Sequence, residues 1–176
     1  MTSSTLLDGG EISLAVNRIS LQVLEKNHTP DNLAIIGIHT CGVFLAQRIR
    51  KFIEKQTSFV PPYGSLDINL YRDDWSLITQ NPVVKTTDIS FAVEGKDIIL
   101  VDDVLFTGRT IRAAMEALMD YGRPKSIQLA ILVDRGGREL PIQADYVGLT
   151  TTVRTAERIQ VVSRENNDLE AVVLQS

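Results

Sequence analysis

The sequence contains few of the side chains that build metal clusters or covalent cross-links. Among 176 residues there is one cysteine, Cys41, and there are two histidines, His28 and His39. A single cysteine excludes an internal disulfide and a cysteine metal cluster. Two histidines do not favour a histidine-based zinc site.

Long apolar runs and an excess of basic charge are also missing. No apolar run approaches the ~20 residues of a membrane span, and residues 1–10 lack the basic flank and apolar core of a signal peptide. We therefore expect a cytoplasmic protein with no membrane partner. The net charge of −4 weakens the case for an RNA partner without removing it, because RNA-binding proteins usually present a basic face. The length predicts a single domain, residues 1–176.

The most informative stretch joins a predicted strand to a predicted helix. Residues 98–101 are apolar and mostly β-branched, Asp102 and Asp103 follow, and residues 107–110 open an amphipathic helix. The first turn of a helix binds phosphate through its backbone N–H groups, and Gly108 permits a close approach. Carboxylates repel phosphate, so the two acids are expected to bind sugar hydroxyls or a hydrated Mg²⁺. The stretch predicts a ribose 5-phosphate site, and the alternative is a buried strand before a simply capped helix.

Two further loops follow predicted buried strands. Residues 33–38 precede the loop 39–42, and residues 126–133 precede the loop 134–139. Ligands of an α/β sheet bind beyond the carboxyl ends of its strands, so these loops and 102–110 are expected to converge.

The remaining pattern completes a mostly parallel α/β sheet flanked by helices. We expect a first helix over residues 8–27, which Asp8 and Glu11 open with the spacing of a capping box. Further strands are expected at residues 66–71, 88–93 and 145–148, with a terminal hairpin of residues 158–162 and 169–174. Residues 75–85 are expected to form a mobile loop.

Two motifs resemble a known family. Residues 101–110, Val-Asp-Asp-Val-Leu-Phe-Thr-Gly-Arg-Thr, resemble the phosphoribosyl-pyrophosphate motif of type I phosphoribosyltransferases. Residues 132–142, Leu-Val-Asp-Arg-Gly-Gly-Arg-Glu-Leu-Pro-Ile, resemble its PyrR branch, pyrimidine operon regulators with uracil phosphoribosyltransferase activity. The resemblance covers about residues 6–162 and implies the type I phosphoribosyltransferase fold, with a small hood and a C-terminal hairpin. It also implies a homodimer or a higher homo-oligomer.

The resemblance implies an enzyme that converts uracil and phosphoribosyl pyrophosphate, with Mg²⁺, to UMP and pyrophosphate. The alternative is a UMP-sensing regulator that binds leader RNA and has little catalytic activity. Another pyrimidine-like base also stays open as the substrate.

The resemblance also implies roles for individual residues. Asp102 and Asp103 are expected to bind the ribose diol, either directly or close to the Mg²⁺ of the substrate. Thr40, Cys41 and Gly42 are expected to bind the pyrophosphate. Arg72 is expected to bind it as well, and the alternative for Arg72 is a solvated arginine at the end of a strand. The expected contacts to the phosphoribosyl group and to uracil come from Val104, Leu105, Phe106, Thr107, Gly108, Arg109 and Thr110, and from Asp134, Arg135 and Gly136. For Arg135 and Arg138 the alternative is a charged turn.

The chain departs from its relatives at informative positions. Purine-salvage enzymes place an aspartate before the Thr-Gly pair, where this chain has Phe106, so guanine and hypoxanthine are not expected as substrates. Some relatives have a basic residue where Cys41 stands, so one charge is missing from the pyrophosphate loop.

A second set of departures concerns RNA. The chain has Gly137, Gln143 and Leu149 where RNA-binding relatives tend to have His, Arg and Lys. Arg18, Arg135 and Arg138 stay in place. We therefore expect RNA binding to be weak, altered in target or absent.

Overall fold

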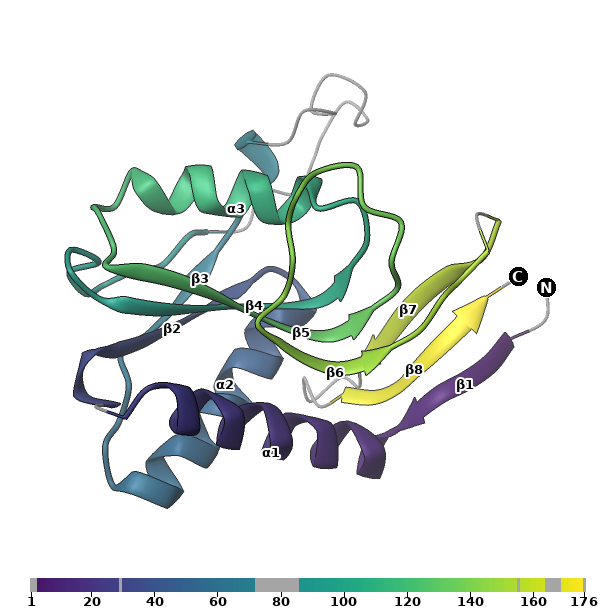
Figure 1. Ribbon diagram of the computed structural model, residues 1–176, viewed down its shortest axis with the longest axis horizontal. Helices are drawn as coiled ribbons and strands as arrows, with labels where there is room; N and C mark the ends of the chain where they lie inside the picture. Colours follow the sequence, from purple (N-terminus) through teal and green to yellow (C-terminus); the bar gives the residue numbers. More distant parts are fainter. Residues whose placement is uncertain (1–2, 29, 72–85, 155, 164–168, 176) are drawn as a thin grey trace.

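The computed structural model describes residues 3–28, 30–71, 86–154, 156–163 and 169–175. Its centre is a five-stranded parallel sheet in the order β3-β2-β4-β5-β6. Helices α1 and α2 cover one face of this sheet and α3 covers the other (Figure 1). The bounds are β2 Leu33–Ile38, β3 Tyr63–Leu66, β4 Asp97–Leu105, β5 Ser126–Asp134, β6 Tyr146–Thr150, α1 Gly9–Lys26, α2 Cys41–Thr57 and α3 Arg109–Met119, with short 3-10 helices at Pro30–Asn32 and Asn69–Tyr71.

The central strands are buried on both faces, as expected for a parallel sheet between helix layers. Alternate side chains point to opposite sides: Ile35 and Ile99 pack with α1 and α2, whereas Ile36 and Leu100 pack with α3. This packing leaves the carboxyl ends of the strands as the edge at which loops can carry a site. None of the described helices is long and apolar enough to span a bilayer.

A smaller antiparallel sheet lies beside the carboxyl ends of β4, β5 and β6 (Figure 1). Its strands are β1 (Ser3–Asp8), β8 (Leu169–Gln175) and β7 (Arg158–Ser163), in the order β1-β8-β7. The predicted hairpin is confirmed as β7 and β8. The sequence did not reveal β1, whose residues are mostly exposed and whose partner lies at the other end of the chain.

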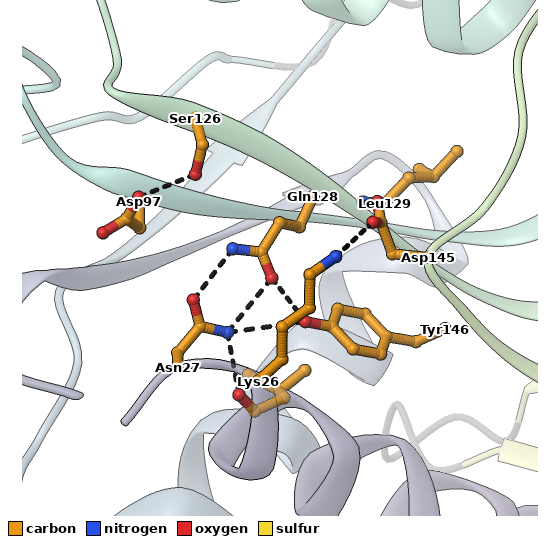
Figure 2. Close-up of polar contacts among 9 residues, drawn as sticks. Lys26, Asn27, Asp97, Ser126, Gln128, Leu129, Asp145 and Tyr146 are labelled. Atoms are coloured by element: carbon orange, nitrogen blue, oxygen red, sulfur yellow. Dashed lines mark hydrogen bonds and ion pairs between the residues drawn. The ribbon is translucent and has the colours of Figure 1, made fainter. Parts of the chain in front are cut away.

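Helix α1 is joined to the amino ends of β5 and β6 by a polar network (Figure 2). Gln128, which is 8% exposed, donates to Asn27 Oδ1 at 2.8 Å and accepts from Asn27 Nδ2 at 3.0 Å and from the Tyr146 hydroxyl. Burial raises the pKa of Tyr146, which keeps this hydroxyl protonated as a donor. Lys26 pairs with Asp145 at 2.6 Å. The network lies at the end of the sheet opposite to the three predicted loops and holds α1 in place.

The capping box of α1 is confirmed. Asp8 Oδ1 accepts from the Glu11 N–H at 2.8 Å, and Glu11 Oε2 accepts from the Asp8 N–H at 2.9 Å. The helix therefore begins where the sequence pattern placed it.

Two predicted strands are wrong. Of residues 66–71 only Leu66 lies in a strand, as the last residue of β3, because the Asp67 carboxylate accepts the Asn69 N–H at 3.0 Å and turns the following chain into a 3-10 helix. Of residues 88–93, only Asp88 pairs, as an isolated antiparallel bridge to Ser65. The polar and apolar residues alternate as in a strand, but a side-chain turn at Asp67 and a single bridge at Asp88 form in place of continuous strand pairing.

The predicted end of the central strand is also corrected. Strand β4 does not stop before the two acids but continues through them to Leu105, because β5 pairs with it as far as Asp134. Asp102 and Asp103 are therefore strand residues with fixed backbones, not members of a loop.

Candidate active site

Three loops meet at the carboxyl edge because β2, β4 and β5 are adjacent and parallel. The start of α2 packs closely against β4 at Gly42. A Cβ at this position would lie 2.5 Å from the Val101 carbonyl oxygen and 3.0 Å from Asp102 Cα. Glycine is thus required for the close approach that sets residues 39–42, called the pyrophosphate loop after their predicted role, beside Asp102 and Asp103. The peptide bond between His39 and Thr40 in this loop is cis.

The two carboxylates have different surroundings. Asp102 is 5% exposed, and its Oδ1 accepts the Asp103 N–H at 2.9 Å. Burial, and then the neighbouring Asp103 charge, raise the pKa of Asp102 well above its ordinary value. Asp103 is only half-buried and accepts the Val104 N–H at 2.9 Å. Asp103 is therefore the more accessible of the two acceptors.

The loop of residues 106–110, called the phosphate loop after its predicted role, turns from β4 into α3 at Gly108. Its φ of 92° lies in the left-handed region, and a Cβ there would meet Ile142 at 3.3 Å. The Thr107 hydroxyl accepts the Arg109 N–H at 3.3 Å. This geometry presents the first turn of α3, with its positive dipole end, at the same edge as the acids.

The loop of residues 134–142, called the base loop after its predicted role, is hydrogen-bonded to the phosphate loop. The Thr107 carbonyl accepts the Glu139 and Leu140 N–H groups at 3.0 and 3.1 Å. The Arg135 N–H donates to the Leu105 carbonyl at 3.1 Å. These backbone bonds, with an exposed ion pair between Arg109 and Glu139 at 2.6 Å, make the two loops one unit.

Comparison with known proteins identifies this arrangement. A family model described as the phosphoribosyl transferase domain matches residues 2–166. The Bifunctional protein PyrR of Syntrophobacter fumaroxidans is 45% identical over 173 residues, which cover 98% of this chain and 93% of the relative. That of Caldicellulosiruptor bescii is 51% identical over 171 residues, covering 97% and 94%. The chain belongs to the PyrR family of phosphoribosyltransferases.

Solved structures agree on the fold. A hypoxanthine-guanine phosphoribosyltransferase from Bacillus anthracis matches with a TM-score of 0.68 at 17% identity, over 88% of this chain and 86% of that one. A Trypanosoma cruzi hypoxanthine phosphoribosyl transferase matches with 0.70 at 18% identity, over 96% and 90%. The predicted family, the phosphoribosyltransferase activity and the fold with its C-terminal hairpin are thereby confirmed.

In this PyrR-family site Phe106 is held by its neighbours. The Arg135 guanidinium lies 4.0 Å from the centre of the Phe106 ring, and Arg135 Nη1 donates to the Glu157 carbonyl at 3.2 Å. A Cβ on Gly137, whose φ is 76°, would lie 2.5 Å from the same ring. Arg135 is 8% exposed and its guanidinium donates to main-chain oxygens of residues 154 and 157, so its role in binding a base stays a prediction beside the alternative of a charged turn.

The base loop borders an open cleft of about 550 Å³ at the carboxyl ends of β5 and β6. Asp134 and Gly136 line it, while the Asp134 carboxylate is used within the loop, where it accepts the Gly136 N–H at 2.9 Å. The described lining residues do not include the acid pair. The described residues that line the cleft are Asp134, Gly136, Arg138, Leu140, Pro141, Ile142, Gln143, Thr150, Thr151 and Thr152.

Other predicted site residues lie as follows. The Leu105 side chain is buried in the core beside α3, so a ligand can meet only its backbone. Cys41 is half-buried, with its Sγ 4.0 Å from the Val161 carbonyl oxygen. Arg72 and the expected mobile loop 75–85 lie outside the described residues, and their roles stay predictions. Within the described ranges, no three or more His, Cys, Asp or Glu side chains gather as metal ligands.

Sequence reasoning missed the role of Arg138 within the site. Its guanidinium donates to the Phe106 carbonyl at 2.9 Å, across 32 positions of sequence. No local pattern signals such a contact, because it depends on how the two loops pack.

Proposed function

We propose that the chain is a uracil phosphoribosyltransferase that forms UMP and pyrophosphate from uracil and phosphoribosyl pyrophosphate. The observation that supports this most is the union of the phosphate loop and the base loop beside Asp103. A nucleoside 5-monophosphate has a phosphate, a ribose diol and a base, and these three parts match the three adjacent features.

The residues of the chain act mainly by holding and orienting the substrates. The first turn of α3 binds the 5-phosphate, Asp103 and Asp102 accept from the ribose hydroxyls, and the loop 39–42 binds the pyrophosphate. In the reaction the bond from the anomeric carbon to pyrophosphate breaks, a bond to a uracil nitrogen forms, and that nitrogen loses its proton. Holding both reactants in line and stabilising the separating charges supplies the rate enhancement.

Mg²⁺ accompanies the substrate in this proposal. Proteins usually bind Mg²⁺ through one or two carboxylates together with substrate phosphates, and the half-buried Asp103 fits such a partial ligand set. When bound, Mg²⁺ neutralises charge on the leaving pyrophosphate. Asp102, which is buried and bonded to the neighbouring N–H, orients the strand end that carries Asp103.

Phe106 supports a pyrimidine over a purine. Its ring can neither accept a proton from a purine nitrogen nor donate one to it, and the ring lies against the Arg135 guanidinium. We expect no formation of GMP or IMP under conditions in which UMP forms. Turnover of guanine or hypoxanthine at the rate seen with uracil would contradict this.

We propose that binding of leader RNA is weak or absent. Arg18 donates to the Gly148 carbonyl, and Arg135 and Arg138 donate to carbonyl oxygens within the site, so these guanidiniums are engaged by the chain itself. The net charge of −4 further weakens the attraction of the chain to RNA phosphates. A gel-shift with pyrimidine leader RNA and UMP tests this, and tight, sequence-specific binding would favour the regulator instead.

The decisive assay for the enzyme measures UMP formation by the purified protein from uracil, phosphoribosyl pyrophosphate and Mg²⁺. Asp103→Asn keeps the shape of the side chain but weakens its acceptor and metal-binding capacity. We expect robust activity in the parent and a loss of about 100-fold in the variant. A parent that binds UMP but forms none would instead make this site a nucleotide sensor.

The proposal also covers the oligomeric state and the cellular location of the protein. We propose a homodimer or a higher homo-oligomer, which sedimentation of the purified chain tests. A cytoplasmic location goes with substrates that are charged phosphate esters.

A further inference from the structure

We propose that Arg138 is a positioning residue that keeps the phosphate loop in register with the base loop. The inference rests on the proposed function, because it concerns how one nucleotide spans both loops. It assigns to this arginine neither contact with substrate nor contact with RNA.

The guanidinium of Arg138 bonds to both ends of the base loop and to the phosphate loop. Nη2 pairs with Asp134 Oδ2 at 2.5 Å at the end of β5, and Nε donates to the Ile142 carbonyl at 2.8 Å at the end of the base loop. Nη1 donates to the Phe106 carbonyl of the phosphate loop at 2.9 Å. The side chain is 23% exposed, and its bonds to Asp134 and Ile142 are partly buried, whereas the bond to the Phe106 carbonyl is exposed. One side chain thus closes the base loop on itself and ties it to the phosphate loop.

The planar fork of arginine is suited to this task. Its donors point in fixed directions and can serve three acceptors at once, whereas a lysine ammonium is a compact charge on a flexible stem. The Phe106 carbonyl directly precedes Thr107, so loss of this bond changes the position of the base loop relative to the phosphate loop. The ring of Phe106 moves with it relative to Arg135, 4.0 Å away.

The functional consequence depends on how much of the site a ligand spans. UMP must satisfy the phosphate loop and the base loop together, so it is sensitive to the distance and angle between them. Ribose 5-phosphate uses only the phosphate loop and the acids. A loss of register should therefore weaken UMP much more than ribose 5-phosphate, because a misplacement of about 1 Å can cost as much as 100-fold.

The test compares the dissociation constants of UMP and ribose 5-phosphate by calorimetry, in the full chain and in the variants Arg138→Gln and Arg138→Lys. Arg50→Gln is the matched control. Arg50 is also a half-buried arginine that donates to a carbonyl, that of Pro61 at 2.9 Å, but it lies on α2 away from the two loops. Thermal unfolding of each variant gives the temperature below which all are folded. Steady-state kcat and KM for uracil are measured in parallel.

We expect Arg138→Gln to weaken UMP about tenfold or more and ribose 5-phosphate by less than about twofold. Arg138→Lys should show the same selective loss, which keeps the test valid if the glutamine variant does not fold. Arg50→Gln should leave both constants unchanged. Equal losses for both ligands, or none for UMP, would overturn the proposal. A parent that binds UMP without forming it refutes the enzyme but leaves this comparison decisive.

Discussion

The close approach of α2 to β4 gives a sharp prediction at Gly42. An alanine Cβ there would lie 2.5 Å from the Val101 carbonyl oxygen and 3.0 Å from Asp102 Cα. Both neighbours are backbone atoms and cannot rotate away. Because ordinary heavy-atom contacts begin near ~3.4 Å, the start of α2 must move outward by about 1 Å in Gly42→Ala.

This displacement separates the pyrophosphate loop from the acid pair. Overpacking of this kind costs about 1–3 kcal/mol of unfolding free energy, and a 1 Å error in placing reactants can cost about 100-fold in rate. We expect kcat/KM for phosphoribosyl pyrophosphate to fall by roughly that factor, with a protein that is still folded at the assay temperature. The measurements are initial rates of UMP formation and urea unfolding.

Gly95→Ala is the control for this variant. Gly95 also needs its glycine, with a φ of 70°, but no heavy atom lies within 4 Å of a Cβ built there, and it precedes β4 at the opposite end of the sheet. Alanine should cost about 1 kcal/mol of stability and leave kinetics unchanged. A Gly42→Ala enzyme with kcat/KM within about twofold of the parent would refute the reasoning.

Two further predictions concern buried polar groups. Burial raises the pKa of Asp102, so the folded state holds a proton that the unfolded state releases, and stability falls as pH rises from the ordinary value of 3.8 toward the raised one. Asp102→Asn should remove this pH dependence, so the unfolding free energy of the variant should rise relative to that of the parent toward neutral pH. Urea unfolding at several pH values measures this, and a difference that does not change with pH would contradict it. Gln128→Leu should cost about 2–3 kcal/mol, because Asn27 and Tyr146 lose their partner. Loss of the exposed Gln160 in Gln160→Leu should change stability by less than about 0.5 kcal/mol, and equal costs at both positions would contradict the burial argument.

The motif residues show how far sequence chemistry reaches. The order of apolar run, acids and Thr-Gly predicted the phosphate loop, and the structure sets that loop beside residues 134–139 as expected. It did not predict that β4 continues through Asp102 and Asp103, because the strand is extended by its pairing with β5. Phe106 and Gly137 both differ from the residues of relatives, but the sequence does not indicate that Gly137 lies against the Phe106 ring.

The sequence by itself determined the features that depend on neighbours within a few residues. The Asp8–Glu11 capping box, the apolar run of β2 and the helix start after Gly108 belong to this class, because spacing and residue type act directly on the local backbone. Tertiary structure alone decided the pairing of β1 with β8 and the bonds of Arg138 to the phosphate loop. These contacts join residues far apart in the chain. Their formation depends on how the finished layers pack, and a periodic pattern records which side of an element is buried but not what is buried against it.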